Sequence, residues 1–378
     1  MLPKFRAAVA LTAASSILCL PARALVTLND GKDHIFVTGT VSMAYDSNIY
    51  AHAGPDTGDT IYSAGLLFEY TRKAGWIGVN GSVGLDVSHF GKNQNEDFSD
   101  PRFNLELNKT TGRTTGALTL SAARENRADD AANLRDQSWN YAADLNFKYP
   151  VIERYSISGD VGYTDCVYDN TTALSNLSTY TAGADLLYAF TSERDLLAGY
   201  RYRYSQTSSD AAFDDNSFTA GVSGKIVSRL NGSIRAGYEV RSPRGGSKEG
   251  SYKGLPASGA VTFTATKRLS LTGEVSKDTS VTSTNLSVDT LSADLNAQYV
   301  FNSKLSVSAD VGVGDSRFLG LSGGGRHDEY FTWGCGLSYT MMAHLKAALA
   351  YSYYQNWSTL SYADYTRNSF TLTLTSRW

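Results

Sequence analysis

Histidines and acidic residues near a glycine-rich segment are the groups best suited to catalysis or metal binding. Residues 323–329 read Gly-Gly-Gly-Arg-His-Asp-Glu, which resembles an anion-binding loop or a His–Asp pair. This segment lies between two predicted strands and not before a helix, so a phosphate-binding loop is not expected. The five histidines are His34, His52, His89, His327 and His344. None has a second histidine at metal-binding spacing, and no Gly-x-Ser-x-Gly motif occurs.

The remaining catalytic candidates are few. They are His89, His327 with Asp328, and Asp129 with Asp130. We therefore expect no catalytic residue, no metal and no cofactor, and a rim-located enzyme is the least favoured alternative.

Charged residues at every second position suggest a different chemistry, that of a polar channel wall. A basic sector is predicted in the middle of the chain, comprising Arg201, Arg203, Lys225, Arg235 and Arg241. Acidic candidates flank it on both sides, and they are Asp144, Asp160, Asp185, Asp294 and Asp310. A field between such sectors could steer ions, with the basic sector guiding anionic solutes. The alternative is that these side chains pair with one another and merely solvate or plug the lumen.

Alternating segments of about ten residues must position these charges. In residues 139–149, Trp139, Tyr141, Leu145 and Phe147 share one face, whereas Asp144 belongs to the other. Residues 180–190 and 291–301 repeat this pattern. Period 2 excludes an amphipathic helix. Aromatic residues at both ends of the apolar face are typical of transmembrane β-strands.

The connections alternate between short and long. Short turns are predicted at residues 109–113, 191–194, 266–268 and 302–304, and longer polar loops at 46–58, 128–136, 169–176, 206–215 and 242–251. This rhythm predicts an antiparallel up-and-down barrel with about 18 strands, with 16 as the alternative. Residues 102–108 and 269–275 are the weakest predicted strands.

The two ends of the chain indicate export and insertion. Lys4 and Arg6, an apolar stretch and Ala22-Arg23-Ala24 form a signal peptide, so residues 1–24 are predicted to be removed and residues 25–378 to form the barrel. Removal of Lys4, Arg6 and Arg23 changes the net charge from −3 to −6. The last strand alternates and ends on an aromatic residue. Its predicted assembly signal is Phe370, Leu372, Leu374 and Trp378.

Composition agrees with a β-barrel. The chain has 24 Tyr, 34 Gly and only 7 Pro, and a mean hydropathy of −0.26. Because a barrel strand is half lipid-facing and half lumen-facing, average hydropathy conceals the membrane. Cys166 and Cys335 remain after processing, and a disulfide between them is left open. The segment Tyr-Arg-Tyr-Arg-Tyr at 200–204 divides between the two faces of a strand, so no nucleic-acid partner is expected.

Several segments resemble the putative β-barrel porin (type 2) family. They are Tyr-Asp-Ser-Asn-Ile-Tyr at 45–50, residues 197–204, 214–218 and 221–224, and residues 230–241. The resemblance implies a porin-like outer-membrane barrel, sometimes associated with exopolysaccharide export, and it transfers no catalytic residue. Trp378 departs from the phenylalanine at which many barrels end.

Together these patterns predict an outer-membrane channel of a Gram-negative bacterium. It would pass small polar solutes or export polysaccharide, and the alternative is a structural or adhesive barrel with a blocked lumen. The expected partners are outer-membrane lipid, lipopolysaccharide, the barrel-assembly machinery and, for polymer export, polysaccharide-export components.

Overall fold

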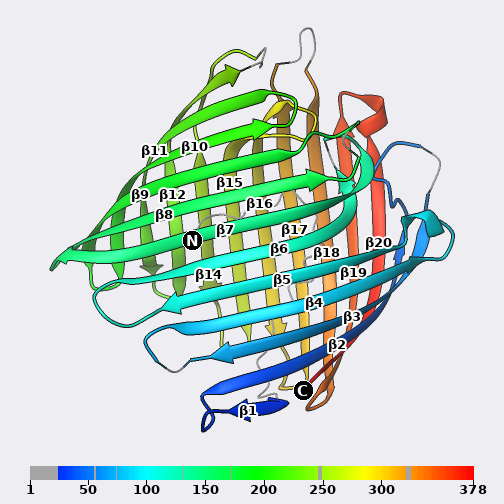
Figure 1. The fold of residues 1–378 in the computed structure, drawn as a ribbon, viewed down its shortest axis with the longest axis horizontal. Coiled ribbons are helices and arrows are strands. Elements are labelled where there is room, and N and C mark those ends of the chain that lie inside the picture. The colour runs from blue at the N-terminus through cyan, green and yellow to red at the C-terminus, as the bar shows by residue number, and fades with distance from the viewer. Residues whose placement is uncertain are drawn as a thin grey trace.

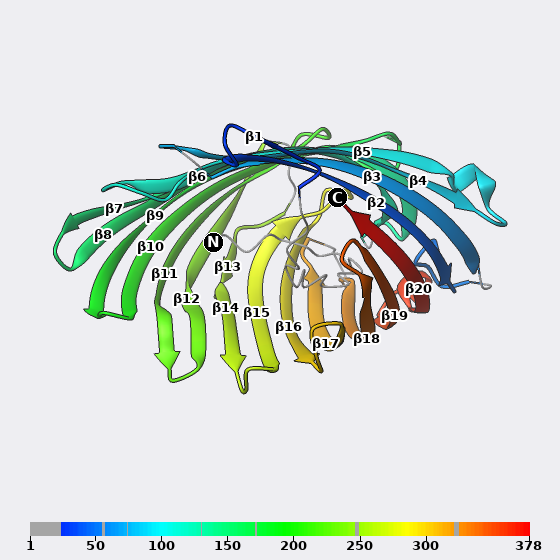
Figure 2. The ribbon, with the colours of Figure 1, turned by 90° about the horizontal axis from the view of Figure 1, so that it is seen from below.

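A single antiparallel sheet closes on itself to form a barrel (Figures 1 and 2). The computed structural model describes residues 24–54, 57–73, 75–129, 131–170, 172–245, 249–320 and 325–378. The predicted signal peptide and its cleavage site fall almost entirely outside these residues. Within them the sheet has 20 strands, of which 18 form the wall. The 18-strand prediction is confirmed, and the 16-strand alternative is wrong.

The wall strands follow one another around the barrel in chain order. They are β2 (Asp33–Asp46), β3 (Asp59–Arg72), β4 (Gly78–Phe90), β5 (Phe98–Lys109), β6 (Thr115–Asp129), β7 (Leu134–Ile152), β8 (Tyr155–Tyr168), β9 (Leu177–Thr191), β10 (Arg194–Thr207), β11 (Ala211–Val227), β12 (Leu230–Gly245), β14 (Ala257–Thr264), β15 (Leu269–Val281), β16 (Ser287–Val300), β17 (Leu305–Phe318), β18 (His327–Met342), β19 (Leu345–Ser358) and β20 (Tyr365–Arg377).

Closure is made between the first and last wall strands. β2 and β20 pair antiparallel from Thr38 opposite Arg377 to Asp46 opposite Ser369. Figure 1 shows β2, in dark blue, running beside β20, in red. Every wall strand therefore has two hydrogen-bonded neighbours, which removes the free edges that an open sheet would present to lipid.

Two short strands complete the sheet. β1 (Val26–Leu28) pairs with the start of β2. β13 (Tyr252–Gly254) pairs with Glu239–Arg241 of β12, and β14 continues along β12 from Ala257. Leu255 and Pro256 interrupt what would otherwise be one strand. Proline has no N–H to donate to the ladder, so the break falls where the sequence requires it.

The predicted apolar faces point outward. On β7, Tyr141, Leu145 and Phe147 are exposed on the outer surface, as are Leu291 and Leu295 on β16. The polar residues between them therefore face the lumen. Period 2 in the sequence thus translates directly into lipid-facing and lumen-facing sides.

The long–short rhythm of connections separates the two ends of the barrel. Two-residue turns join β7 to β8, β9 to β10, β11 to β12 and β18 to β19. They all lie at the end of the barrel where β2 begins and β20 ends. We call this the turn end, and the opposite one the loop end. Three predicted loops are wrong in extent. Residues 128–136 include the end of β6 and the start of β7, and residues 242–251 include the end of β12. Residues 206–215 are mostly strand, because β10 and β11 stay paired up to Gln206 opposite Ala212 and Phe213 is fully buried.

Two further features bear on the sequence predictions. Among the described residues, none of the helices is long or apolar enough to span a membrane. Cys166 and Cys335 are free thiols. Cys166 shares the lumen-facing side of β8 with Asp160, whereas Cys335 is exposed on the outer face of β18 between Trp333 and Leu337. A disulfide within one chain is therefore ruled out by geometry.

Candidate functional site

The five predicted basic residues lie on the inward face, but each is ion-paired. Lys225 Nζ lies 3.0 Å from Glu193 Oε1 at the turn end. Arg235 Nη1 lies 2.9 Å from Asp185 Oδ2, a predicted acidic residue on β9. Arg201, Arg203 and Arg241 join a larger network described below. Of the two sequence-based interpretations, these contacts favour the one in which the basic side chains pair with neighbouring carboxylates.

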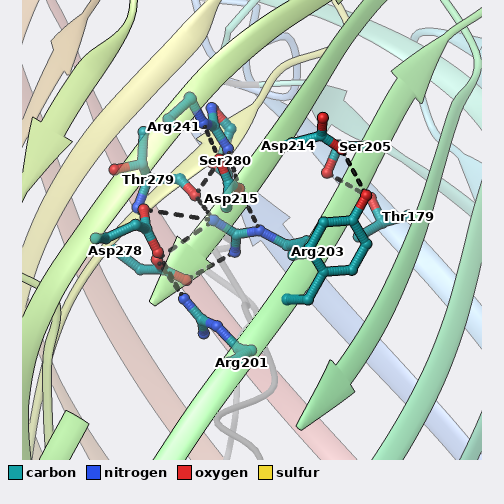
Figure 3. Close-up of polar contacts among 12 residues, drawn as sticks. Thr179, Arg201, Arg203, Ser205, Asp214, Asp215, Arg241, Asp278, Thr279 and Ser280 are labelled. Atoms are coloured by element: carbon teal, nitrogen blue, oxygen red, sulfur yellow. Dashed lines mark hydrogen bonds and ion pairs between the residues drawn. The ribbon is translucent and has the colours of Figure 1, made fainter. Parts of the chain in front are cut away.

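Three arginines and three carboxylates form a charge cluster near the loop end, as Figure 3 shows in part. Its members are Arg201 and Arg203 of β10, Asp215 of β11, Glu239 and Arg241 of β12, and Asp278 of β15. Three positive and three negative charges make it formally neutral. Asp215 is fully buried and Arg241 is 1% exposed. A buried charge is tolerated only when it is paired and hydrogen-bonded, and the cluster meets that condition.

Asp215 is the centre of this charge cluster. Its Oδ2 accepts a hydrogen bond from Arg203 Nε at 2.7 Å, and its Oδ1 accepts one from Arg241 Nε at 2.6 Å. Arg203 Nη1 reaches Asp278 Oδ2 at 2.8 Å. Arg201 Nη2 bridges Glu239 Oε2 and Asp278 Oδ1, at 2.9 and 3.0 Å.

The charge cluster also ties together strands that are not neighbours. Arg241 donates to the backbone carbonyls of Ser280 and Thr279 on β15, at 2.9 and 3.2 Å. Its guanidinium lies 5.2 Å from the centre of the Phe213 ring. β10, β11 and β12 are thereby held against β15 on the lumen side. The cluster fixes the shape of the wall and leaves little free positive charge for a solute.

The predicted acidic residues share a second arrangement. On the inward face, each lies opposite a glycine of the next strand. The pairs are Asp144 with Gly162, Asp160 with Gly183, Asp185 with Gly199, Asp294 with Gly312 and Asp310 with Gly334. A Cβ on Gly183 would lie 2.6 Å from Asp160 Oδ1, and one on Gly334 would lie 2.8 Å from Asp310 Oδ1. Each carboxylate therefore lies over a glycine, in the space that a larger side chain at that position would fill.

Some of these carboxylates have no cationic partner. Asp294 lies opposite Glu274 in the ladder and Asp310 follows on the next strand. Among the described residues, none of these three takes part in an ion pair, and neither does Asp160. The basic residues of the wall are largely paired. The lumen therefore carries surplus negative charge, part of it on β15, β16 and β17.

At the loop end, connections from opposite sides of the barrel meet. Arg326 Nη1, before β18, donates to Ala131 O in the β6–β7 hairpin at 2.5 Å. Ser283 Oγ, between β15 and β16, donates to Asp129 Oδ2 at 2.9 Å. On the other flank, Asn133 Nδ2 donates to Ala51 O at 2.9 Å. The polypeptide itself therefore bridges this mouth, and we call these contacts the loop bridge.

The Tyr-Asp-Ser-Asn-Ile-Tyr segment anchors one of the bridging loops. Asp46 is buried and accepts hydrogen bonds from Arg367 of β20. Ile49 is fully buried, and its carbonyl accepts from Arg135 Nη1 at 3.2 Å. Tyr50 donates its hydroxyl to Glu96 Oε1 at 3.2 Å, and burial raises the pKa of Tyr50. The segment thus turns the β2–β3 loop towards the lumen.

The C-terminal strand is arranged as the sequence predicted. Phe370, Leu372 and Leu374 lie exposed on the outer face. Trp378 exchanges two backbone hydrogen bonds with Val37, at 2.8 and 2.9 Å. Its ring stacks on His344 at 4.1 Å between centroids. Whether Trp378 acts as an assembly signal stays a prediction.

The adjacent His327 and Asp328 do not form a pair. His327 lies on the outward face, where its Nε2 is 2.5 Å from Asp315 Oδ2. Asp328 is buried and accepts from Arg326 and Ser358. Successive strand residues point to opposite faces, so the sequence-based His–Asp pair is wrong. His89 instead pairs with Asp97, whose pKa is held low by the Phe90 N–H and by His89.

Three partners in the charge cluster were missed by sequence reasoning, namely Asp215, Glu239 and Asp278. Glu239 lies on the same face as Arg235 and Arg241, so period 2 alone could have identified it. Asp215 is the last residue of a predicted loop and Asp278 lies beyond the weak predicted strand at 269–275, and no local pattern relates either of them to Arg203.

The comparisons agree with this architecture. Residues 214–378 match the family described as Putative beta-barrel porin 2, which confirms the resemblance over that part of the chain. The segments at 45–50 and 197–204 lie outside the match. No curated protein sequence matches the chain.

Solved structures of outer-membrane proteins share the fold. Pseudomonas aeruginosa OccK2 (OpdF) in complex with glucuronate has a TM-score of 0.51 at 12% identity, covering 91% of this chain and 97% of that one. Pseudomonas aeruginosa OpdO has a TM-score of 0.52 at 11% identity, covering 92% of this chain and 97% of that one. Pseudomonas aeruginosa OpdK with vanillate has a TM-score of 0.50 at 13% identity, covering 91% of this chain and 99% of that one. Together with the apolar outer face and the family match, this fold places the chain in the bacterial outer membrane.

Proposed function

We propose that this chain is a porin-like channel for small polar solutes that favours cations over anions. The observation that carries the proposal is the closed wall of 18 strands with a polar inward face. Barrels of this strand number are wide enough to enclose an aqueous passage, unlike barrels of about 8 strands.

The preference for cations rests on the balance of paired and unpaired charge. All five residues of the predicted basic sector are ion-paired. Asp160, Glu274, Asp294 and Asp310 have no ion-pair partner among the described residues. A ring or sector of carboxylates attracts cations and repels anions in a low-dielectric passage. The sequence-based idea of a basic guide for anionic solutes is therefore replaced by its opposite.

The loop bridge favours small solutes over a polymer. Contacts such as Arg326 to Ala131 and Ser283 to Asp129 cross the mouth. A polysaccharide chain would have to displace them. Polysaccharide export and its export components therefore stay a less favoured proposal. Outer-membrane lipid, lipopolysaccharide and the barrel-assembly machinery are the partners that an outer-membrane barrel requires, and we propose them on that ground.

The loop bridge also supports a second candidate, a structural barrel with a blocked lumen. A mouth crossed by several hydrogen bonds could stay shut in the absence of a partner. A rim-located enzyme has less support, since the one adjacent His–Asp candidate is divided between two faces.

Single-channel recording of the refolded mature protein in a planar bilayer tests the proposal. We expect stable current steps and a reversal potential in a salt gradient that indicates cation preference. Correct insertion is checked by heat-modifiable mobility on gels. An inserted barrel that passes no current would refute the channel and favour the structural role, and anion preference would refute the charge argument.

A further inference from the structure

Four side chains, those of Asp315, Arg317, His327 and Glu329, form a compact group on the outer face near the loop end. Asp315 lies opposite Glu329 and Arg317 lies opposite His327 in the ladder between β17 and β18. Residues of the same parity, Val313 on β17 and Trp333 on β18, are 49% and 40% exposed on the outer surface. This group of side chains therefore lies just beyond the apolar band, outside the lumen and apart from the proposed passage.

Three of these side chains offer ligand atoms to a single point. One ligand atom each from Asp315, His327 and Glu329 lies within 4.8 Å of the other two. Two ligands of a tetrahedral zinc ion, each about 2.1 Å from the metal, are about 3.4 Å apart. Small side-chain rotations would bring these three atoms to that spacing, because none of the three residues is fully buried.

We propose that Asp315, His327 and Glu329 form a binding site for a divalent metal ion of the zinc class. One imidazole nitrogen and two carboxylates suit zinc, whereas magnesium and calcium prefer sites made of oxygen atoms alone. Three protein ligands leave a fourth position open to water or to an anion from outside. His327 Nε2 would exchange its hydrogen bond to Asp315 for the metal.

Arg317 is the group that opposes the metal. Its Nε lies 3.2 Å from Asp315 Oδ1, and its side chain is 68% exposed. An exposed ion pair adds little stability because water screens it, so the arginine can be displaced at little cost. Its positive charge should nevertheless lower the affinity of the site for a metal ion. Replacing Arg317 with a neutral residue should therefore tighten metal binding, whereas replacing a ligand should weaken it.

No sequence motif marks this site, because its ligands come from two strands. Asp315 lies before the glycine-rich segment and His327 lies after it, so no spacing motif links them. The outer pair of His89 and Asp97 provides a matched control. His89 Nδ1 lies 2.6 Å from Asp97 Oδ2, and both side chains are partly exposed, as those of His327 and Asp315 are. No third ligand completes that pair among the described residues.

Equilibrium dialysis of the untagged, detergent-solubilised protein against zinc tests the proposal without requiring an open channel. We expect about one zinc per chain, at least tenfold weaker binding in His327→Ala and in Glu329→Gln, unchanged binding in His89→Ala, and tighter binding in Arg317→Gln. Heat-modifiable mobility confirms that each variant is folded. Absence of saturable zinc binding in the wild type would overturn the proposal. Equal loss in His327→Ala and His89→Ala would do the same, as would magnesium binding as tight as zinc binding.

Discussion

Removal of two lumen carboxylates should reduce the preference for cations. Asp294 and Asp310 lie on the neighbouring strands β16 and β17, face the lumen and have no ion-pair partner among the described residues. Replacing both with asparagine removes two negative charges and retains the side-chain shape. The glycines opposite them stay unchanged, so the wall should keep its form.

The size of the effect follows from Coulomb's law. The Coulomb interaction energy between a passing ion and a carboxylate about 8 Å away in water is about 0.5 kcal/mol, and screening at 0.1 M salt reduces it to about 0.2 kcal/mol. The two carboxylates together therefore attract a cation, or repel an anion, by about 0.5 kcal/mol. In the double variant cations lose this attraction and anions lose an equal repulsion, so the free-energy difference between cation and anion permeation changes by about 0.9 kcal/mol. The permeability ratio of cations to anions should therefore fall about fivefold at 0.1 M salt.

Screening provides an internal check. At 1 M salt the Debye length is about 3 Å, so the same substitution should change the ratio by less than about 1.5-fold. The measurement is the reversal potential of single channels in a salt gradient at both ionic strengths. Asp289→Asn is the control, since Asp289 lies on the outer face of β16 beside Lys277. An unchanged ratio at 0.1 M in a conducting double variant would refute the reasoning.

Three other perturbations test the architecture. Arg203→Ala removes one of the two arginine partners of each buried carboxylate, Asp215 and Asp278, and it should lower the free energy of unfolding in urea by about 3–5 kcal/mol. Arg326→Ala removes a contact of the loop bridge, and it should increase single-channel conductance. Deletion of Trp378 removes two backbone hydrogen bonds with β2, and it should slow assembly of the heat-modifiable form.

Each of these has a result that would contradict it. A stability loss below about 1 kcal/mol in Arg203→Ala would mean that the charge cluster is solvated. Arg244→Ala serves as its control, because Arg244 is 65% exposed in its ion pair with Asp214. Unchanged conductance in Arg326→Ala would show that the bridge does not limit the current. Normal assembly without Trp378 would show that Phe370, Leu372 and Leu374 suffice.

The sequence by itself determined the strands and their faces. Alternation in residues 139–149 predicted which side chains of β7 face lipid, because side-chain direction in a strand depends only on position parity. Turn and loop lengths predicted two distinct ends and 18 wall strands. Even the weak segments 102–108 and 269–275 proved to be strands, β5 and β15, since closure requires every wall strand to have two neighbours.

Only the tertiary structure decided which charges remain free. Arg203 and Asp278 are 75 residues apart, and Ser283 and Asp129 are 154 residues apart. Such partners meet because the register of each strand pair and the curvature of the closed wall bring them together. Parity specifies the face on which a charge lies but not its height or its neighbour on another strand. For that reason the basic sector predicted as a guide for anions is an ion-paired wall, and the surplus charge of the lumen lies with the carboxylates.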